Sequence, residues 1–203
     1  MKHDFIGQQD WPTAVVMPAQ AQHIAEWLVG TLVAIGLLWG VRNLIVRRDP
    51  ALVICMLAGA IACVLEVHTM YMLKFFYPQV GQHVFLVGFG RPIPVFLMLM
   101  YSAFFGLSSY LFLISKQARS FSARGFWLGM AALFVAEAVL EVVSVNVGIW
   151  AYFDDQPFLV MDFPIHVAVI VGCMSVILGA VARVWFDRIK GIRAWGMLIL
   201  CPV

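Results

Sequence analysis

Three acidic residues stand inside long apolar stretches of this chain, where a charge is costly: Glu66, Glu137 and Glu141. An ionisable side chain inside a membrane span costs about 2.5–3.5 kcal/mol on insertion scales, so each is a functional candidate by default. Glu137 and Glu141 are four residues apart and share one face of a helix. Two carboxylates on one apolar face repel and desolvate each other, so we expect at least one to hold a proton near neutral pH. Such a neutral carboxyl is a general acid, whereas the structural alternative is hydrogen bonding of the acids to neighbouring helices.

Other polar groups lie close to these acids in the sequence. His68 follows Glu66 by two residues, which is about 200° around a helix, so the two side chains face different neighbours. His166 opens an apolar stretch and could approach Glu141 or Asp162. Asp162 joins Glu66 and Glu141 as a candidate catalytic acid. The Glu-x-x-His spacing of carboxylate di-metal sites does not occur in the chain, so we expect no metal and no other cofactor.

Aromatic residues gather in two segments between apolar stretches, residues 74–91 (the first lid) and residues 150–163 (the second lid). Trp and Tyr favour the headgroup level of a membrane, so one interpretation is an interfacial belt. The other is a pocket whose ring faces stabilise a carbocation through cation–π attraction. On that second interpretation, the candidate substrate-binding residues are Tyr71, Phe89, Arg91, Trp150, Tyr152, Glu137, His68 and His166. The chain has no phosphate-binding loop or dinucleotide fingerprint, and we expect no nucleic-acid partner.

The elements that must carry these residues are membrane-spanning helices. Hydrophobic residues make up 63% of the 203-residue chain and charged residues only 12%, which excludes an ordinary soluble fold. Each long apolar stretch has about twenty residues or more, enough to cross a hydrocarbon core about 30 Å thick. We therefore predict an all-α, polytopic transmembrane helix bundle that forms a single domain over residues 1–203. Full spans are predicted at 24–46, 51–73, 92–115, 125–149 and 164–186, and an incomplete sixth run begins near Ala194.

The basic residues predict the orientation of this bundle in the membrane. Most Lys and Arg residues lie at the end of the first span, between the third and fourth spans, or after the fifth span. The N-terminus should therefore be extracytoplasmic and the 116–124 loop cytoplasmic. Residues 1–22 are expected to form an outer amphipathic segment. We expect the plasma (inner) membrane as the location, with the lipid bilayer and a lipophilic small molecule as partners.

The tetrapeptide Val-Leu-Glu-Val occurs twice, at 64–67 and at 139–142. Each copy stands late in a span, is followed by a lid, and leads to a segment opened by proline, where we expect the first turn of the next helix. The pattern predicts an internal repeat of two helices with residues 50–115 and 125–186 as its units. Such units keep their orientation in the membrane, as parallel transporter repeats do, so Glu66 and Glu141 should lie at similar depth.

A family resemblance rests on Glu66 in the second span, on the aromatic lids, and on a G-x-W-x-Y…P-F stretch. That stretch reads Gly148-Ile149-Trp150-Ala151-Tyr152 with Gln156-Pro157-Phe158. It resembles the small integral-membrane enzymes of isoprenoid chemistry, which include carotenoid hydratases, heterodimeric-type lycopene cyclases and membrane-bound meroterpenoid cyclases. The chain departs from them in lacking the paired-Glu signature of lycopene cyclases and in being shorter than the seven-span cyclases.

The resemblance implies acid catalysis on a lipophilic isoprenoid, in which an intramembrane acid protonates an alkene or epoxide without a metal. On this reading Glu66 is the acid by its span position, with Glu141 and Asp162 as weaker matches. Two other classes stay open. A small multi-span transporter or ligand-binding membrane protein would also use midplane acids and outer lids. A structural subunit would carry the acids only as paired, buried groups.

Overall fold

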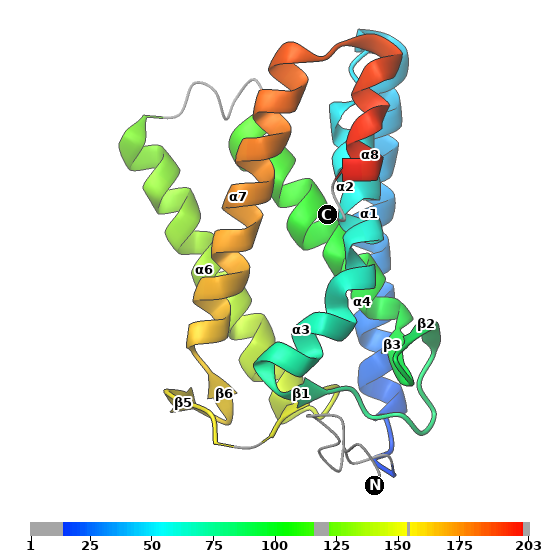
Figure 1. The fold of residues 1–203 in the computed structure, drawn as a ribbon, viewed down its shortest axis with the longest axis vertical. Helices are drawn as coiled ribbons and strands as arrows, with labels where there is room; N and C mark the ends of the chain where they lie inside the picture. Colours follow the sequence, from blue (N-terminus) through cyan, green and yellow to red (C-terminus); the bar gives the residue numbers. More distant parts are fainter. Residues whose placement is uncertain (1–13, 116–121, 154, 201–203) are drawn as a thin grey trace, which may run out of the picture.

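The computed structural model describes residues 14–115, 122–153 and 155–200, which form a bundle of long helices with short strands at one end (Figure 1). Five helical stretches are long and apolar enough to span a membrane, which confirms the predicted all-α bundle. They run over Ala19–Arg47, Ala51–Leu73, Val95–Phe112, Ala123–Asn146 and His166–Arg188. The predicted outer segment 1–22 and the predicted cytoplasmic loop 116–124 fall largely outside the described residues.

The first, fourth and fifth spans are continuous helices: α1 (Ala19–Arg47), α6 (Ala123–Asn146) and α7 (His166–Arg188). Helix α6 begins with an N-cap, because the Ser122 hydroxyl accepts a hydrogen bond of 3.1 Å from the backbone N–H of Gly125. Large apolar side chains on these helices face outward, such as Trp27, which is 77% exposed, and Trp127, which is 67% exposed. Apolar surface of this extent is stable only when lipid is the solvent.

The second and third spans are interrupted. Helix α2 (Ala51–Ala62) passes into a 3₁₀ turn, η1 (Cys63–Leu65), before α3 (Glu66–Leu73) continues at a visible angle (Figure 1). Helix α4 (Val95–Tyr101) passes into the π-helical segments η2 (Ser102–Leu107) and η3 (Tyr110–Ile114). Mid-helix 3₁₀ turns and π-bulges are frequent at functional sites, and Glu66 stands directly after the first of these irregularities.

Three antiparallel strand pairs form the lid end of the bundle. Strand β1 (Phe75–Phe76) pairs with β4 (Ala151–Tyr152), and therefore joins the two lids. Within the first lid β2 (Val84–Gly88) pairs with β3 (Arg91–Pro94). Within the second lid β5 (Leu159–Val160) pairs with β6 (Phe163–Pro164).

The sequence predicted the prolines after the lids in the first turn of the next helix. The structure places them in strands instead. Pro92 and Pro94 belong to β3 and Pro164 to β6, and α4 and α7 begin only after them. A proline disfavours the helical conformation in the residue before it and is tolerated in an edge strand, so the strand extends up to each proline.

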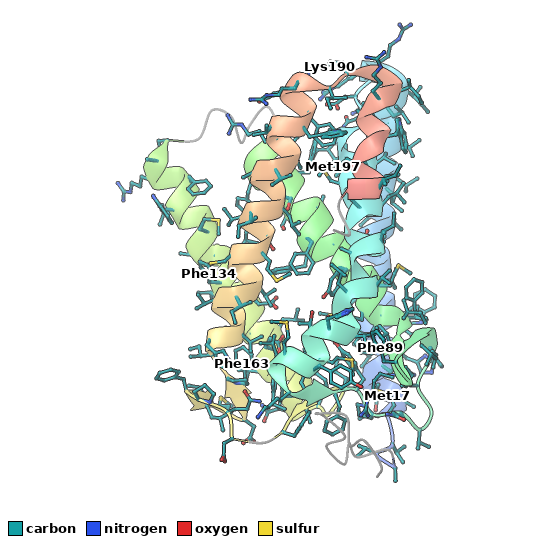
Figure 2. All side chains as sticks on the ribbon, viewed as in Figure 1. Met17, Phe89, Phe134, Phe163, Lys190 and Met197 are labelled. Carbon is teal, nitrogen blue, oxygen red and sulfur yellow. The ribbon has the colours of Figure 1, made fainter. Side chains whose placement is uncertain are left out.

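The sixth apolar run is not a span within the described residues. It forms the turn η4 (Gly191–Gly196) and the short helix α8 (Met197–Leu200), which returns beside α2 (Figure 1). Ala194 and Met197 join the main apolar core of the bundle, and the Trp185 indole N–H donates a 3.1 Å hydrogen bond to the Ala194 carbonyl. Figure 2 places Lys190 and Met197 toward this end of the molecule and Phe89 and Phe163 toward the lids.

Candidate functional site

The three intramembrane acids line one cavity at the lid end of the bundle. The cavity measures about 60 Å³, and Glu66, Glu137 and Glu141 contribute the carboxyls in its wall. A buried water needs about 10–15 Å³ on this measure, so the space holds a small group and not a whole lipid. Most of the remaining wall is aromatic or aliphatic, and its rings are those of Phe75, Tyr77, Tyr101, Phe104, Phe105, Trp150 and Tyr152.

Glu66 is the most completely buried of the three acids, with 3% of its surface exposed. The Tyr77 hydroxyl donates to Oε1 and the Tyr101 hydroxyl to Oε2, both at 2.5 Å. Lys74, which ends α3, has a positive φ of 51°, and the chain turns there so that Tyr77 comes back toward Glu66. The two hydrogen bonds favour the charged form of the Glu66 carboxyl, whereas its burial favours the neutral form.

Glu141 accepts two hydrogen bonds from the second lid. Trp150 donates its indole N–H at 2.9 Å and Tyr152 its hydroxyl at 3.0 Å, both to Oε2. Gly148 has a positive φ of 78° where the chain leaves α6, which lets it turn sharply toward Trp150. Glu141 is therefore also held as a hydrogen-bond acceptor, although on one oxygen only.

Glu137 differs from both of the other acids. It is 5% exposed and lies one helical turn before Glu141 on α6. Among the residues that the structure describes, no group donates a hydrogen bond to its carboxyl, although the side chain lines the cavity. A carboxyl without donors, buried one turn from a second carboxyl, is the member of the set whose neutral form is favoured.

The two tyrosines of the lids remain hydrogen-bond donors over a wide pH range. Burial, and after it the charge of Glu66, raises the pKa of Tyr77 well above its ordinary value of 10.0. Burial and the charge of Glu141 likewise raise the pKa of Tyr152 above 10.0. Both phenols therefore stay protonated at neutral pH and donate to the carboxyls.

Ring contacts hold these donors in place across the two lids. Tyr77 meets Trp150 edge-on with centroids 6.0 Å apart, and Phe75 lies 5.5 Å from Tyr152. Trp150 also stacks on Phe96 at 6.4 Å. Aromatic pairs at such separations contribute about 0.5–1.5 kcal/mol each beyond burial, so the wall of the cavity is rigid on its lid side.

The contacts around the two Val-Leu-Glu-Val segments correspond. Tyr77 and Tyr152 each follow their acid by eleven residues. Tyr77 comes directly after β1 and Tyr152 is the last residue of β4, the strand that pairs with β1. Phe75 and Trp150, which each follow their acid by nine residues, contact Tyr152 and Tyr77 respectively. A duplicated helix–lid–helix unit requires such matched contacts, and the duplication stays a prediction.

The structure brings together five of the residues singled out from the sequence, namely Glu66, Glu137, Glu141, Trp150 and Tyr152. Four others form a separate group on the first lid and α3, outside the cavity wall. The Arg91 guanidinium lies 5.9 Å from the ring centroid of Tyr71, and His68 meets Phe89 edge-on at 5.6 Å. Phe89 is 75% exposed, so this group covers the outer surface of the lid.

The last two predicted residues also lie outside the cavity wall. Asp162 is exposed in the turn between β5 and β6, where its φ is 63°. His166 is half-buried at the start of α7, and its Nδ1 is buried without a hydrogen-bond partner among the described residues. Their catalytic and binding roles therefore have no counterpart in the geometry of the acidic site.

Two functional tyrosines were missed from the sequence, Tyr77 and Tyr101. Tyr77 carried a signal in the sequence, because Tyr152 follows the second acid by the same number of residues; Tyr101 carried none, since it reaches Glu66 from another span.

No protein-family model, curated protein or solved structure matches this chain.

Proposed function

We propose that this protein is an integral membrane enzyme that protonates an alkene or epoxide of a lipophilic isoprenoid and so cyclises or hydrates it. The observation that carries the proposal is that the three carboxyls around one mostly apolar cavity differ in their hydrogen-bond donors. Glu66 and Glu141 each accept two hydrogen bonds, whereas no described group donates to Glu137. A neutral acid beside two fixed carboxylates suits general acid catalysis better than a purely structural role.

Glu137 is the proton donor in this proposal, and Glu66 and Glu141 are the fixed negative charges near it. The sequence suggested Glu66 and Glu141 as the acids and Glu137 as a binding residue. We assign the proton donor to Glu137 instead, because donors that point at a carboxylate stabilise its charge and oppose its protonation. Asp162 receives no role, since it is exposed in the second lid.

The proposed reaction begins when the Glu137 O–H bond breaks and its proton joins an alkene carbon or an epoxide oxygen. The positive charge then rests on a neighbouring carbon, facing the carboxylates of Glu66 and Glu141 and the rings of Trp150 and Tyr152, which stabilise a cation. In cyclisation a second alkene of the substrate attacks this carbon, and a proton lost from the new cation returns to Glu137. In hydration a water attacks and its proton returns to Glu137. Neither outcome requires an oxidant or a metal.

The size of the cavity restricts the substrate to one that inserts an end group. About 60 Å³ accepts the reacting terminus of a chain, while the rest of an isoprenoid would lie among the outer apolar side chains and the lipid. This arrangement matches a long, apolar molecule with one reactive end. It does not match a polar solute that must pass through the bundle.

The test compares isoprenoid lipids extracted from membranes of cells with and without the protein, followed by turnover in Glu137→Gln. The amide keeps the size of Glu137 but carries no acidic proton, so we expect turnover to fall by about 10²–10⁴-fold. Asp155→Asn is the matched control, because Asp155 is an exposed acid of the second lid. Unchanged lipid profiles, or full turnover in Glu137→Gln, would contradict the proposal.

A further inference from the structure

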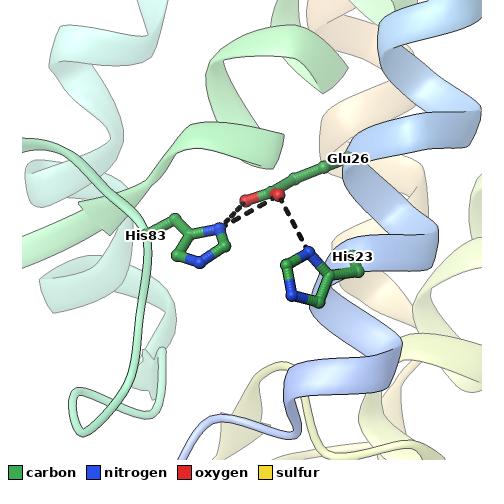
Figure 3. Close-up of side chains that lie close together, drawn as sticks. All are labelled: His23, Glu26 and His83. Atoms are coloured by element: carbon green, nitrogen blue, oxygen red, sulfur yellow. Dashed lines mark hydrogen bonds and ion pairs between the residues drawn. The ribbon is translucent and has the colours of Figure 1, made fainter.

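A second group of potential ligands lies at the lid end, apart from the acidic site. His23 and Glu26 are on α1, and His83 comes from the first lid (Figure 3). His83 Nδ1 lies 2.8 Å from Glu26 Oε1 and 3.0 Å from Oε2, and His23 Nδ1 lies 3.8 Å from Oε2. One ligand atom from each residue fits within 4.8 Å of the others. We call this group the histidine cluster.

The fold positions the histidine cluster from both of its sides. His23 and Glu26 are three residues apart on α1, so they share one face of the helix. His83 is held through its backbone: its N–H donates to Gln22 Oε1 at 2.9 Å, and its carbonyl accepts from the Val95 N–H at 2.8 Å. Gln22 is 1% exposed and also donates to the Gly81 carbonyl at 3.3 Å. The lid therefore presents His83 to α1 in one fixed place.

We propose that the histidine cluster binds a divalent transition metal of the zinc class and clamps the first lid to α1. Two imidazoles and one carboxylate form a ligand set that suits zinc, and they leave a fourth position for water. Ligand atoms around a tetrahedral zinc ion are about 3.3 Å apart, given bonds of about 2.0–2.2 Å. The separations of 2.8 and 3.8 Å from the carboxylate lie on either side of that value, so small rotations of the side chains would complete the site.

The simpler reading is that Glu26 and His83 only hydrogen-bond and that His23 is a bystander. The two readings differ in the role of His23, which contacts Glu26 at 3.8 Å and meets the His83 ring edge-on at 5.1 Å. A hydrogen bond between Glu26 and His83 does not require the His23 imidazole, whereas the proposed metal site requires it as a ligand. The proposal stands independently of the chemistry at the acidic site.

The test titrates zinc into the purified full-length protein in lipid nanodiscs and measures stoichiometry and affinity by calorimetry. We expect one zinc per chain. We expect Glu26→Gln, His23→Asn and His83→Asn each to weaken binding by at least about tenfold, since even partners outside the ligand set change metal affinity by about 10–100-fold. His68→Asn is the control, because His68 is an exposed histidine outside the cluster and its loss should leave the affinity unchanged.

A further variant distinguishes loss of a metal ligand from loss of the fold. His83→Cys replaces one metal ligand by another, so binding should persist, and with cobalt(II) as the probe the spectrum should gain a thiolate-to-metal charge-transfer band that is missing from the original protein. Zinc binding that is equally strong in all three cluster variants would overturn the proposal, as would a cobalt spectrum of His83→Cys without that band.

Discussion

Tyr77 follows Glu66 by eleven residues and donates a 2.5 Å hydrogen bond to its carboxyl from the first lid. Tyr152 stands in the same relation to Glu141, at 3.0 Å, from the second lid. Each lid therefore closes over the span before it by satisfying the acid in that span. The lids and the buried acids form one structure, so loss of a lid contact should change the environment of the carboxyl.

Removal of the Tyr77 hydroxyl should destabilise the protein. In Tyr77→Phe the buried carboxyl of Glu66 loses one of its two donors, and an unsatisfied buried polar group costs about 1–3 kcal/mol. Tyr71→Phe is the comparison, because Tyr71 is 40% exposed and outside the cavity wall. Thermal unfolding of the two variants in the same detergent measures the difference, and equal melting temperatures would count against a carboxylate at Glu66.

The lid tyrosines should make the protein sensitive to alkali. The pKa values of Tyr77 and Tyr152 are raised above 10.0 in the folded state. Their stabilising contribution is therefore complete below about pH 10 and is lost as the pH rises above it, since the unfolded chain then ionises its tyrosines while the folded chain does not. Ultraviolet titration should show at least two fewer phenolates in the folded protein than in the denatured one near pH 11. Equal phenolate counts in both states would contradict this.

The close approach of α2 to the start of η2 at Gly59 should tolerate no added side chain. A Cβ at Gly59 would lie 2.6 Å from the carbonyl oxygen of Tyr101 and 3.0 Å from the backbone nitrogen of Gly106. Gly59→Ala must push α2 away from the start of η2, which we expect to cost about 1–3 kcal/mol. Tyr101 should shift with the backbone and release Glu66, so turnover should fall as well.

The matched control for this crowding is Gly30→Ala on α1. A Cβ at Gly30 meets only the Leu99 Cδ1 atom, at an ordinary 3.7 Å. Alanine is favoured over glycine in a helix by about 0.5–1 kcal/mol, so this variant should be as stable as the original protein or slightly more stable. Unfolding midpoints of the two variants, measured side by side, decide whether the glycine effect is steric.

The orientation predicted from the basic residues is testable without a structure. A reporter fused within the 116–124 loop should be active in the cytoplasm, and one fused in the first lid should be active outside it. The described residues agree in one respect, because Arg47, Arg48 and Lys190 line one pocket at the end of the bundle opposite the lids. A cytoplasmic signal from the lid fusion would reverse the topology and place the acidic site near the inner leaflet.

Much of the architecture could be predicted from the sequence because apolar length and charge are properties of segments. The runs of about twenty apolar residues predicted the five spans, since a helix of that length is the simplest way to satisfy its backbone in lipid. The second span was placed at 51–73 and is found at Ala51–Leu73. The starts of the third and fifth spans were predicted at 92 and 164, but the helices begin at Val95 and His166, because the prolines there extend β3 and β6.

Only the tertiary structure decided which groups contact each acid. The sequence identified Glu66, Glu137 and Glu141 as functional candidates, because an ionisable residue inside a span costs free energy. It could not identify their hydrogen-bond donors, which come from other spans and from the lids. Tyr101 contacts Glu66 although 35 residues separate them in the sequence, and no local sequence pattern predicts such a contact. The histidine cluster shows the same limit, because His83 meets Glu26 across 57 residues. Apolar length predicts the helical spans because it is a property of one segment, whereas the groups that meet at each carboxyl depend on how distant segments pack.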